Sequence, residues 1–222
     1  MNVSEAIRKR KSIRDFKPDP VPGDILRDIL DLACRAPSAM NTQPWKFLVV
    51  TGRTLEEIKR ENIERLRAGI MPGEEHLIVG WSQDSVYRRR QVELAMQLFQ
   101  LMGIKREDRE ERARWIERGF RFFDAPAAVI LLTDRALMEG SPILDMGAVM
   151  QNICLAALEY GLGTCIEDQG VMYPDVVRKH CGIPDADMIV IAIAIGYPNP
   201  GFPANRLEST RESVDSITTW LS

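Results

Sequence analysis

Two polar stretches carry side chains that could bind a phosphorylated ligand. Arg10, Ser12 and Arg14 alternate in the segment RKRKSIRDF. In an extended turn such alternation points all three side chains to one side, where they would suit a phosphate dianion, although a solvated basic helix end has the same spacing. The loop PSAMNTQPW carries Asn41 and Gln43. Their amides could hydrogen-bond the edge of a polar heterocycle or satisfy the backbone of their own turn.

Catalysis by side chains alone is not indicated. The chain has no GxSxG, HExxH, GxGxxG or GxxxxGK[ST] motif, and His180 and Cys181 are adjacent on a predicted helix, where neighbours do not face each other. An enzyme with this sequence would therefore rely on a cofactor. No zinc site or disulfide framework is predicted, because the cysteines lack CxxC spacing. All are expected to be small buried thiols in a reducing compartment, namely Cys34, Cys154, Cys165 and Cys181.

The composition is that of a globular domain. At 222 residues the chain can bury a sizeable core, and 45% hydrophobic with 27% charged residues excludes disordered and collagenous classes. A net charge of -3 argues against a dedicated nucleic-acid binder. The basic N-terminus has no apolar segment typical of a signal peptide, and no apolar run is long enough for a membrane span. We therefore expect a cytoplasmic protein with no nucleic-acid or membrane partner.

Periodicity and capping signals predict helices and strands without strict βαβ alternation. The predicted helices cover residues 2–10, 22–36, 54–66, 86–102, 109–122, 142–161 and 174–181, with Thr54 and Glu57 as a capping box. The predicted strands cover 45–50, 127–133 and 188–196, and the short segment GTCIE (163–167) is assigned to neither class. This order favours a single α+β domain with one central mixed β-sheet wrapped by helices. Residues 66–123 would form a helical excursion or lid, and residues 198–222 an extended arm seeking an apolar partner surface for Ile217, Trp220 and Leu221.

Four segments in order resemble the FMN-dependent nitroreductase family. They are RKRKSIRDF, APSAMNTQPWKF, YPDVVRKHCGIPDADMIVIAIAIGYP and the closing ANR, and together they extend over nearly the whole chain. The resemblance implies a nitroreductase-like fold, an intertwined homodimer with C-terminal arm exchange, and FMN at the subunit interface. It also implies that the flavin performs the chemistry, so that no side chain is assigned as catalytic and no metal is expected.

The same resemblance assigns cofactor contacts residue by residue. Arg10, Ser12 and Arg14 would contact the FMN phosphate and ribityl chain, with Arg206 of the ANR segment completing the clamp and Arg211 as the alternative. The PSAMN loop would approach the flavin from the other subunit. The full cofactor-binding set is Arg10, Lys11, Ser12, Arg14, Pro37, Ser38, Ala39, Asn41, Gln43 and Arg206.

Two departures from the family pattern leave questions open. Glu167 and Asp168 stand where many relatives place a proline-containing segment over the flavin, so these carboxylates either face away or lower the reduction potential. The cation or donor that many relatives supply near the flavin N1 and O2 has no clear match, and Arg65 and Arg67 are the candidates.

The implied activity is ping-pong reduction of nitroaromatics, quinones or similar acceptors by NADH or NADPH through FMN. A reductive dehalogenase or ene-type reductase on the same scaffold, or a non-catalytic FMN-sequestering protein, are the alternatives. For the acceptor, Tyr87 could stack on an aromatic ring while Arg88 or Arg90 binds its carboxylate or phenolate. The alternative is that these side chains are all surface groups.

Overall fold

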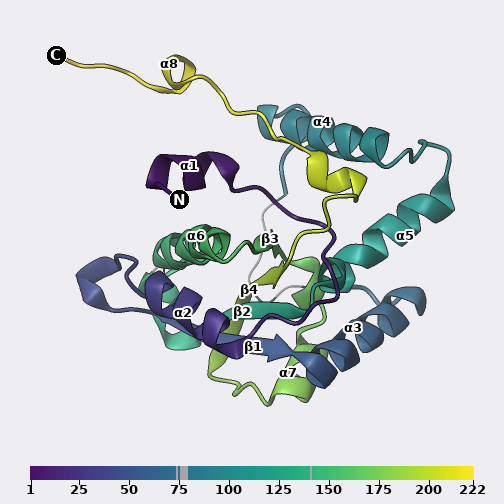
Figure 1. Cartoon of the computed structure of the whole chain (residues 1–222), viewed down its shortest axis with the longest axis horizontal. Helices are drawn as coiled ribbons and strands as arrows, with labels where there is room; N and C mark the ends of the chain where they lie inside the picture. The colour runs from purple at the N-terminus through teal and green to yellow at the C-terminus, as the bar shows by residue number, and fades with distance from the viewer. Residues whose placement is uncertain (74, 76–79, 141) are drawn as a thin grey trace.

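The computed structural model describes residues 1–73, 75, 80–140 and 142–222 (Figure 1). Its sheet has the order β1-β2-β4-β3, formed by β1 (Trp45–Thr51), β2 (Ala127–Asp134), β4 (Asp187–Gly196) and β3 (Gly163–Glu167). The expectation of an α+β domain is confirmed. The prediction of a mixed sheet is wrong for the described strands, because all three of their pairs are antiparallel. Within the described residues the parallel contact is an isolated bridge between Ser12 and Thr164.

Helices cover both faces of the sheet. One face packs against α3 (Gly52–Arg67), α5 (Arg109–Phe120) and α7 (Pro174–Cys181), and the other against α2 (Gly23–Ala33) and α6 (Ile143–Glu159) (Figure 1). Side chains of β2 alternate between the two cores, with Ile130 on the α3 side and Val129 and Leu131 on the α6 side. Burial on both faces explains the uninterrupted apolar runs in β2 and β4.

A long helix and the C-terminal arm lie outside this three-layer body. α4 (Val86–Leu101) packs on the 3-10 turn η5 (Pro203–Arg206), where Leu98, Ala204 and Leu207 form a small separate core. Beyond η5 the chain passes α4 and continues through α8 (Val214–Ile217) away from the rest of the fold (Figure 1). Trp220 and Leu221 are 77% and 93% exposed there, so these two side chains are not buried against the described part of their own chain.

The capping-box prediction for the third helix is wrong. α3 begins at Gly52, after the extended residue Thr51, and no side chain caps its first turn. The carboxylate of Glu57 pairs with Arg53, one turn earlier, at 2.8 Å, instead of reaching back to Thr54. The glycine at φ +54° makes the turn from strand to helix and is itself the first helical residue.

The remaining predicted helices lie close to their expected positions. α1 (Val3–Lys9) begins at an Asn2 side chain that accepts a hydrogen bond from the N–H of Glu5 at 2.9 Å. α4 is followed by Gly103 at φ +68°, as the sequence indicates. No helix among the described residues is both long and apolar enough to cross a lipid bilayer.

Candidate functional site

The basic segment after α1 is extended and lies beside the sheet. Ser12 bridges Thr164 of β3, and the N–H of Ile13 donates to the carbonyl of Thr164 at 2.9 Å. Ile13 is buried in the core on the α3 side of the sheet. Because side chains alternate along an extended segment, Ser12 and Arg14 point away from that core. The half-buried Arg10 and Lys11 immediately precede them.

Asn205 fastens the ANR turn to this segment. Its Oδ1 accepts a hydrogen bond from the N–H of Arg14 at 2.6 Å, and its Nδ2 donates to the carbonyls of Asp15 at 2.8 Å and Asn199 at 2.9 Å. The side chain is 7% exposed and uses both ends of its amide. This clasp brings η5, which contains Arg206, next to the backbone of Arg14, although the two segments are separated by 191 positions.

Asp15 is the acidic residue next to Arg14 in the sequence, and its carboxylate has partners other than Arg14. Its carboxylate accepts hydrogen bonds from the Arg118 guanidinium and from Nδ2 of Asn199. Arg118, in turn, lies 4.6 Å from the Phe202 ring centroid. The Asp15 carboxylate therefore does not neutralise the charge of the neighbouring Arg14.

Three arginines near the clasp have no carboxylate partner among the described residues and suit a phosphate. No carboxylate among the described residues pairs with Arg10, Arg14 or Arg206, and Arg206 is exposed. Unpaired guanidinium groups next to a serine hydroxyl are the donors that a phosphate monoester prefers, because each forms charge-assisted hydrogen bonds. The donor set thus matches the phosphate end of FMN. Arg211, the alternative to Arg206, instead bonds its own neighbours Ser209 and Thr210.

The PSAMN loop adopts an exposed and strained conformation. Met40, Asn41 and Gln43 have φ values of +50°, +60° and +47°, which cost roughly 1 kcal/mol or more for each residue that is not glycine. Internal hydrogen bonds hold this shape: the Gln43 N–H donates to Ser38 Oγ at 3.0 Å, and Gln43 Nε2 donates to the Asn41 carbonyl at 3.2 Å. Pro37 and Ala39 are exposed as well.

Within one chain this loop is far from the arginines. The Ala39 N–H donates to Asp145 at 3.2 Å, which places the loop at the N-terminal end of α6. Ser12 lies against Thr164, beyond the C-terminal end of the same helix. A helix of 17 residues is about 25 Å long. The two predicted halves of the site are therefore not brought together in a single chain.

Glu167 at the end of β3 faces the protein interior. Its Oε2 accepts a hydrogen bond from the Gly170 N–H at 2.8 Å, and both Oε1 and the Phe122 ring lie against Gly170. Burial raises the pKa of this carboxyl to about 8, and the nearby charge of Asp168 adds to the rise. Of the two alternatives from the sequence, Glu167 takes the one in which it faces away.

Neither candidate on α3 supplies an unpaired cation. Arg65 pairs with Asp175 at 2.5 Å and with Glu61 at 3.3 Å. Arg67 forms a two-point contact with Glu117, with N···O distances of 2.7 and 2.8 Å. Both guanidinium groups are satisfied by carboxylates that the sequence pattern did not connect to them.

The predicted acceptor residues separate on α4. Tyr87 is 57% exposed, and the Arg90 guanidinium lies 6.0 Å from its ring centroid. Arg90 is also tied to the C-terminal arm through a 2.6 Å ion pair with Glu212. Arg88 points to another side of the helix, where it donates to Gln91. One anion cannot use both arginines in this arrangement.

The cysteines are all free, but they are not all buried. Cys34, at the C-terminal end of α2, is exposed and Cys181 is half-buried, which corrects the expectation of four buried thiols. The helix ends there and the chain turns outward into the PSAMN loop. Burial raises the pKa of Cys154, and raises that of Cys165 to about 12. These two thiols are therefore protonated and inert at neutral pH.

Comparisons with known proteins show which family the chain and its fold resemble. The model of the Nitroreductase family matches residues 7–197. The chain is 35% identical to the nitrobenzene nitroreductase of Ectopseudomonas oleovorans, in an alignment that covers 99% of this chain and 96% of that protein. It is 32% identical to a 4-nitrobenzoate reductase of Nocardioides sp., in an alignment that covers 97% of this chain and 88% of that protein. The crystal structure of an FMN and NADPH-dependent nitroreductase from Sphigopyxis sp. strain HMH superposes with a TM-score of 0.93 at 30% identity, and all of both chains is covered.

Proposed function

This chain belongs to the nitroreductase family, and on that premise we propose that it is an FMN-dependent oxidoreductase that uses NADH or NADPH to reduce nitroaromatic or quinone-like small molecules. The observation that carries the proposal is the cation cluster at the Asn205 clasp. Its arginines lack carboxylate partners among the described residues, so their guanidinium groups can bind a phosphate.

When bound, FMN supplies two-electron transfer from the nicotinamide to the acceptor in a ping-pong cycle. The protein supplies binding and orientation. Arg10, Ser12, Arg14 and Arg206 hold the phosphate and the adjoining ribityl chain, and Lys11 adds positive charge. Asn205 acts indirectly, since it fixes the position of Arg206 relative to Arg14.

The flavin ring is approached by the PSAMN loop of a second copy of the chain. Three features support a homodimer: the loop and the clasp lie at opposite ends of α6, apolar side chains of α1 and α6 are exposed, and the C-terminal arm is uncovered. The exposed apolar residues are Val3, Ile7, Leu144, Ile217, Trp220 and Leu221. A site shared across the interface would bring the amides of Asn41 and Gln43 to the cofactor. The described part of residues 66–123, which includes α4 and α5, would cover it as a lid, while residues 74 and 76–79 of the predicted lid lie outside the described residues.

Nitro compounds are the favoured acceptors. The relatives described above are named for reducing nitrobenzene and 4-nitrobenzoate. Dehalogenation, ene reduction and storage of FMN without turnover are distinguished by a rapid-mixing panel of nitro, quinone, halophenol and enone compounds against the reduced holoenzyme. Rapid oxidation by nitro compounds or quinones, and not by halophenols or enones, supports the proposal, and lack of oxidation by any acceptor supports the storage function.

The cofactor assignment is tested by charge reversal. Arg206→Glu replaces an attractive phosphate contact by repulsion, so we expect FMN to be lost on desalting. Arg211→Glu, five residues further along the chain, should keep FMN because that side chain bonds its neighbours Ser209 and Thr210. The ratio of flavin to protein absorbance measures both. Loss of FMN in Arg211→Glu and retention in Arg206→Glu would transfer the role to Arg211.

A further inference from the structure

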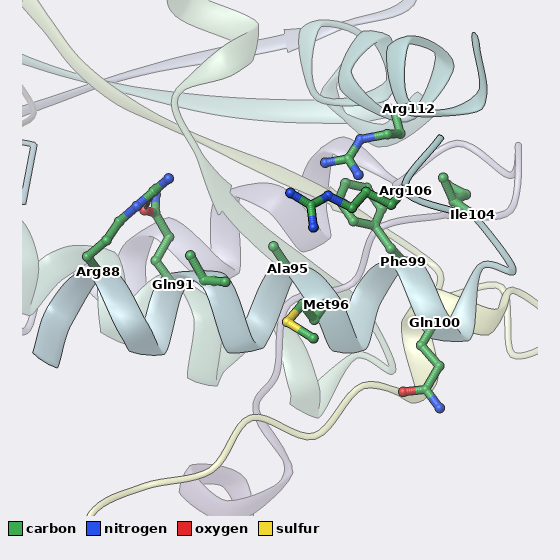
Figure 2. A pocket seen from close by; sticks show the side chains of 10 residues that line it. Arg88, Gln91, Ala95, Met96, Phe99, Gln100, Ile104, Arg106 and Arg112 are labelled. Atoms are coloured by element: carbon green, nitrogen blue, oxygen red, sulfur yellow. Dashed lines mark hydrogen bonds between the residues drawn. The ribbon is translucent and has the colours of Figure 1, made fainter. Parts of the chain in front are cut away.

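A cavity of about 860 Å³ lies along α4 (Figure 2). One face of α4 forms its apolar floor, from Val92, Ala95, Met96 and Phe99. The α4–α5 connection and the first turn of α5 form the other wall. The volume is within the usual range of small-molecule sites.

One end of this cavity carries two positive charges that no carboxylate among the described residues neutralises. Arg106 and Arg112 both line it, and in Figure 2 both side chains extend toward Phe99. The Arg112 guanidinium lies 4.4 Å from the Phe99 ring centroid. Neither arginine pairs with a carboxylate among the described residues. Farther along α5 the arginines behave differently, since each pairs with at least one carboxylate: Arg114, Arg118 and Arg121.

We propose that Arg106 and Arg112 bind the carboxylate or phosphate of an aromatic organic anion, whose ring lies on the apolar floor beside Phe99. Two guanidinium groups next to an apolar surface suit such a ligand, because the anion gains charge-assisted hydrogen bonds while the ring is removed from water. A neutral aromatic molecule would leave the two positive charges without a counter-ion.

This assignment replaces Arg88 and Arg90, which the sequence suggested as the residues that bind the anion. Arg90 is held by Glu212 of the arm. Arg88 lines the same cavity, but eleven residues of helix separate it from Phe99, which corresponds to about 16 Å along the axis. A small aromatic acid that is anchored at Arg106 and Arg112 does not reach Arg88. The anion is therefore bound at the end of the cavity formed by the α4–α5 connection.

Two redox partners carry the required chemistry, and this step rests on the proposed function. One is an acceptor with a carboxylate, such as 4-nitrobenzoate. The other is the 2′-phosphate of NADPH, which NADH lacks. In a ping-pong cycle both partners use the same enzyme in turn, so either could be the anion that is bound.

The test begins with binding, which does not depend on turnover. The oxidised holoenzyme is titrated calorimetrically with benzoate and with neutral methyl benzoate, in wild type and in the double variant Arg106→Ala, Arg112→Ala. Arg109→Ala is the matched control, because Arg109 is an exposed arginine on the first turn of α5 and pairs with no carboxylate in the part of the chain that the structure describes. We expect benzoate to bind roughly ten- to a hundredfold more weakly in the double variant alone, and methyl benzoate to be unaffected.

Steady-state kinetics then identify the source of the anion. A fall in the kcat/KM ratio of 4-nitrobenzoate to its methyl ester assigns the site to the acceptor. A fall in the ratio of NADPH to NADH, measured with neutral nitrobenzene, assigns it to the donor. The anion site is refuted if benzoate affinity and both ratios are unchanged, or if the double variant changes the mass of the oligomer, which would make the cavity a subunit contact. Wild-type protein that binds benzoate through these arginines but reduces no acceptor would refute the proposed function and leave the anion site intact.

Discussion

Glu167 holds the backbone N–H of Gly170 through Oε2 at 2.8 Å, while its Oε1 is buried with no hydrogen-bond partner among the described residues. From the other side, Nδ2 of Asn62 donates to the Gly170 carbonyl at 2.9 Å. Both polar groups of Gly170 are thus held by buried side chains. A side chain at Gly170 would collide with Phe122 and with Glu167 itself, which explains why the position is a glycine. The turn after β3 is fixed by packing from within.

The stability of the protein should decline as the pH approaches 8. Burial raises the pKa of Glu167 from its ordinary value of 4.5 to about 8, so the folded chain binds more protons than the unfolded chain between these values. The resulting stabilisation is complete below pH 4.5 and is lost as the pH rises through 8, with a slope of up to about 1.4 kcal/mol per pH unit. We expect Glu167→Gln to flatten this dependence in urea unfolding between pH 6 and 9. The exposed control Glu208→Gln should follow the wild type. Parallel curves for wild type and Glu167→Gln would mean that the carboxyl is ionised in the fold.

Asn205 and Arg206 should affect different properties. Asn205→Ala removes three hydrogen bonds and leaves buried backbone groups without partners, so we expect a loss of unfolding free energy on the order of 2 to 4 kcal/mol. Arg206→Ala removes an exposed side chain and should change stability by less than about 0.5 kcal/mol. Both should weaken FMN binding. Urea unfolding of the FMN-free proteins, together with FMN titration, separates the two effects. Equal stability of the two variants would contradict the clasp.

Local patterns predicted the elements well but missed the contacts between them. The alternation around Ile13 and the apolar strand β2 were readable, because both depend on neighbours along the chain. Asn205 directly precedes Arg206 in the ANR segment, and only the fold reveals that its side chain binds the backbone at Arg14. The ion pair between Arg90 and Glu212 likewise joins residues with no sequence signal between them. Local patterns carry no information about partners that are distant in sequence.

The buried cysteines should be chemically silent. Burial raises the pKa of Cys154 and Cys165, so neither thiol is ionised at pH 8, where alkylating reagents need the thiolate. We expect iodoacetamide to spare both residues in the native protein and to modify them only after unfolding, as peptide mass spectrometry can show. Replacement of all four cysteines by serine should leave reduction by NAD(P)H possible. A folded, FMN-bound quadruple variant that NAD(P)H cannot reduce would contradict this prediction.

The arm should contribute to dimer affinity. Trp220 and Leu221 are largely exposed in the single chain, and burial against a partner would stabilise the dimer by about 3 kcal/mol or more. Changing both to alanine should therefore weaken dimerisation roughly a hundredfold or more. Sedimentation across a range of protein concentrations measures the change. Ser216→Ala, a polar position on the same arm, is the control. An unchanged dissociation constant in the Trp220, Leu221 variant would remove the arm from the interface.

A mixed dimer can decide whether each FMN site is built from two chains. Arg206→Glu disables the clasp side of the site, and the pair Asn41→Ala, Gln43→Ala disables the loop side, so each homodimer should bind little FMN. In a heterodimer of the two variants, a site shared across the interface has one of its two copies assembled from an intact clasp and an intact loop. We therefore expect about half of the wild-type FMN occupancy and nitrobenzene reduction in heterodimers purified through two different affinity tags. The loop's position at the far end of α6 from Ser12 is the reason for expecting this complementation. If clasp and loop served the same cofactor within one chain, every site in the heterodimer would carry one defect, and neither FMN binding nor activity would return.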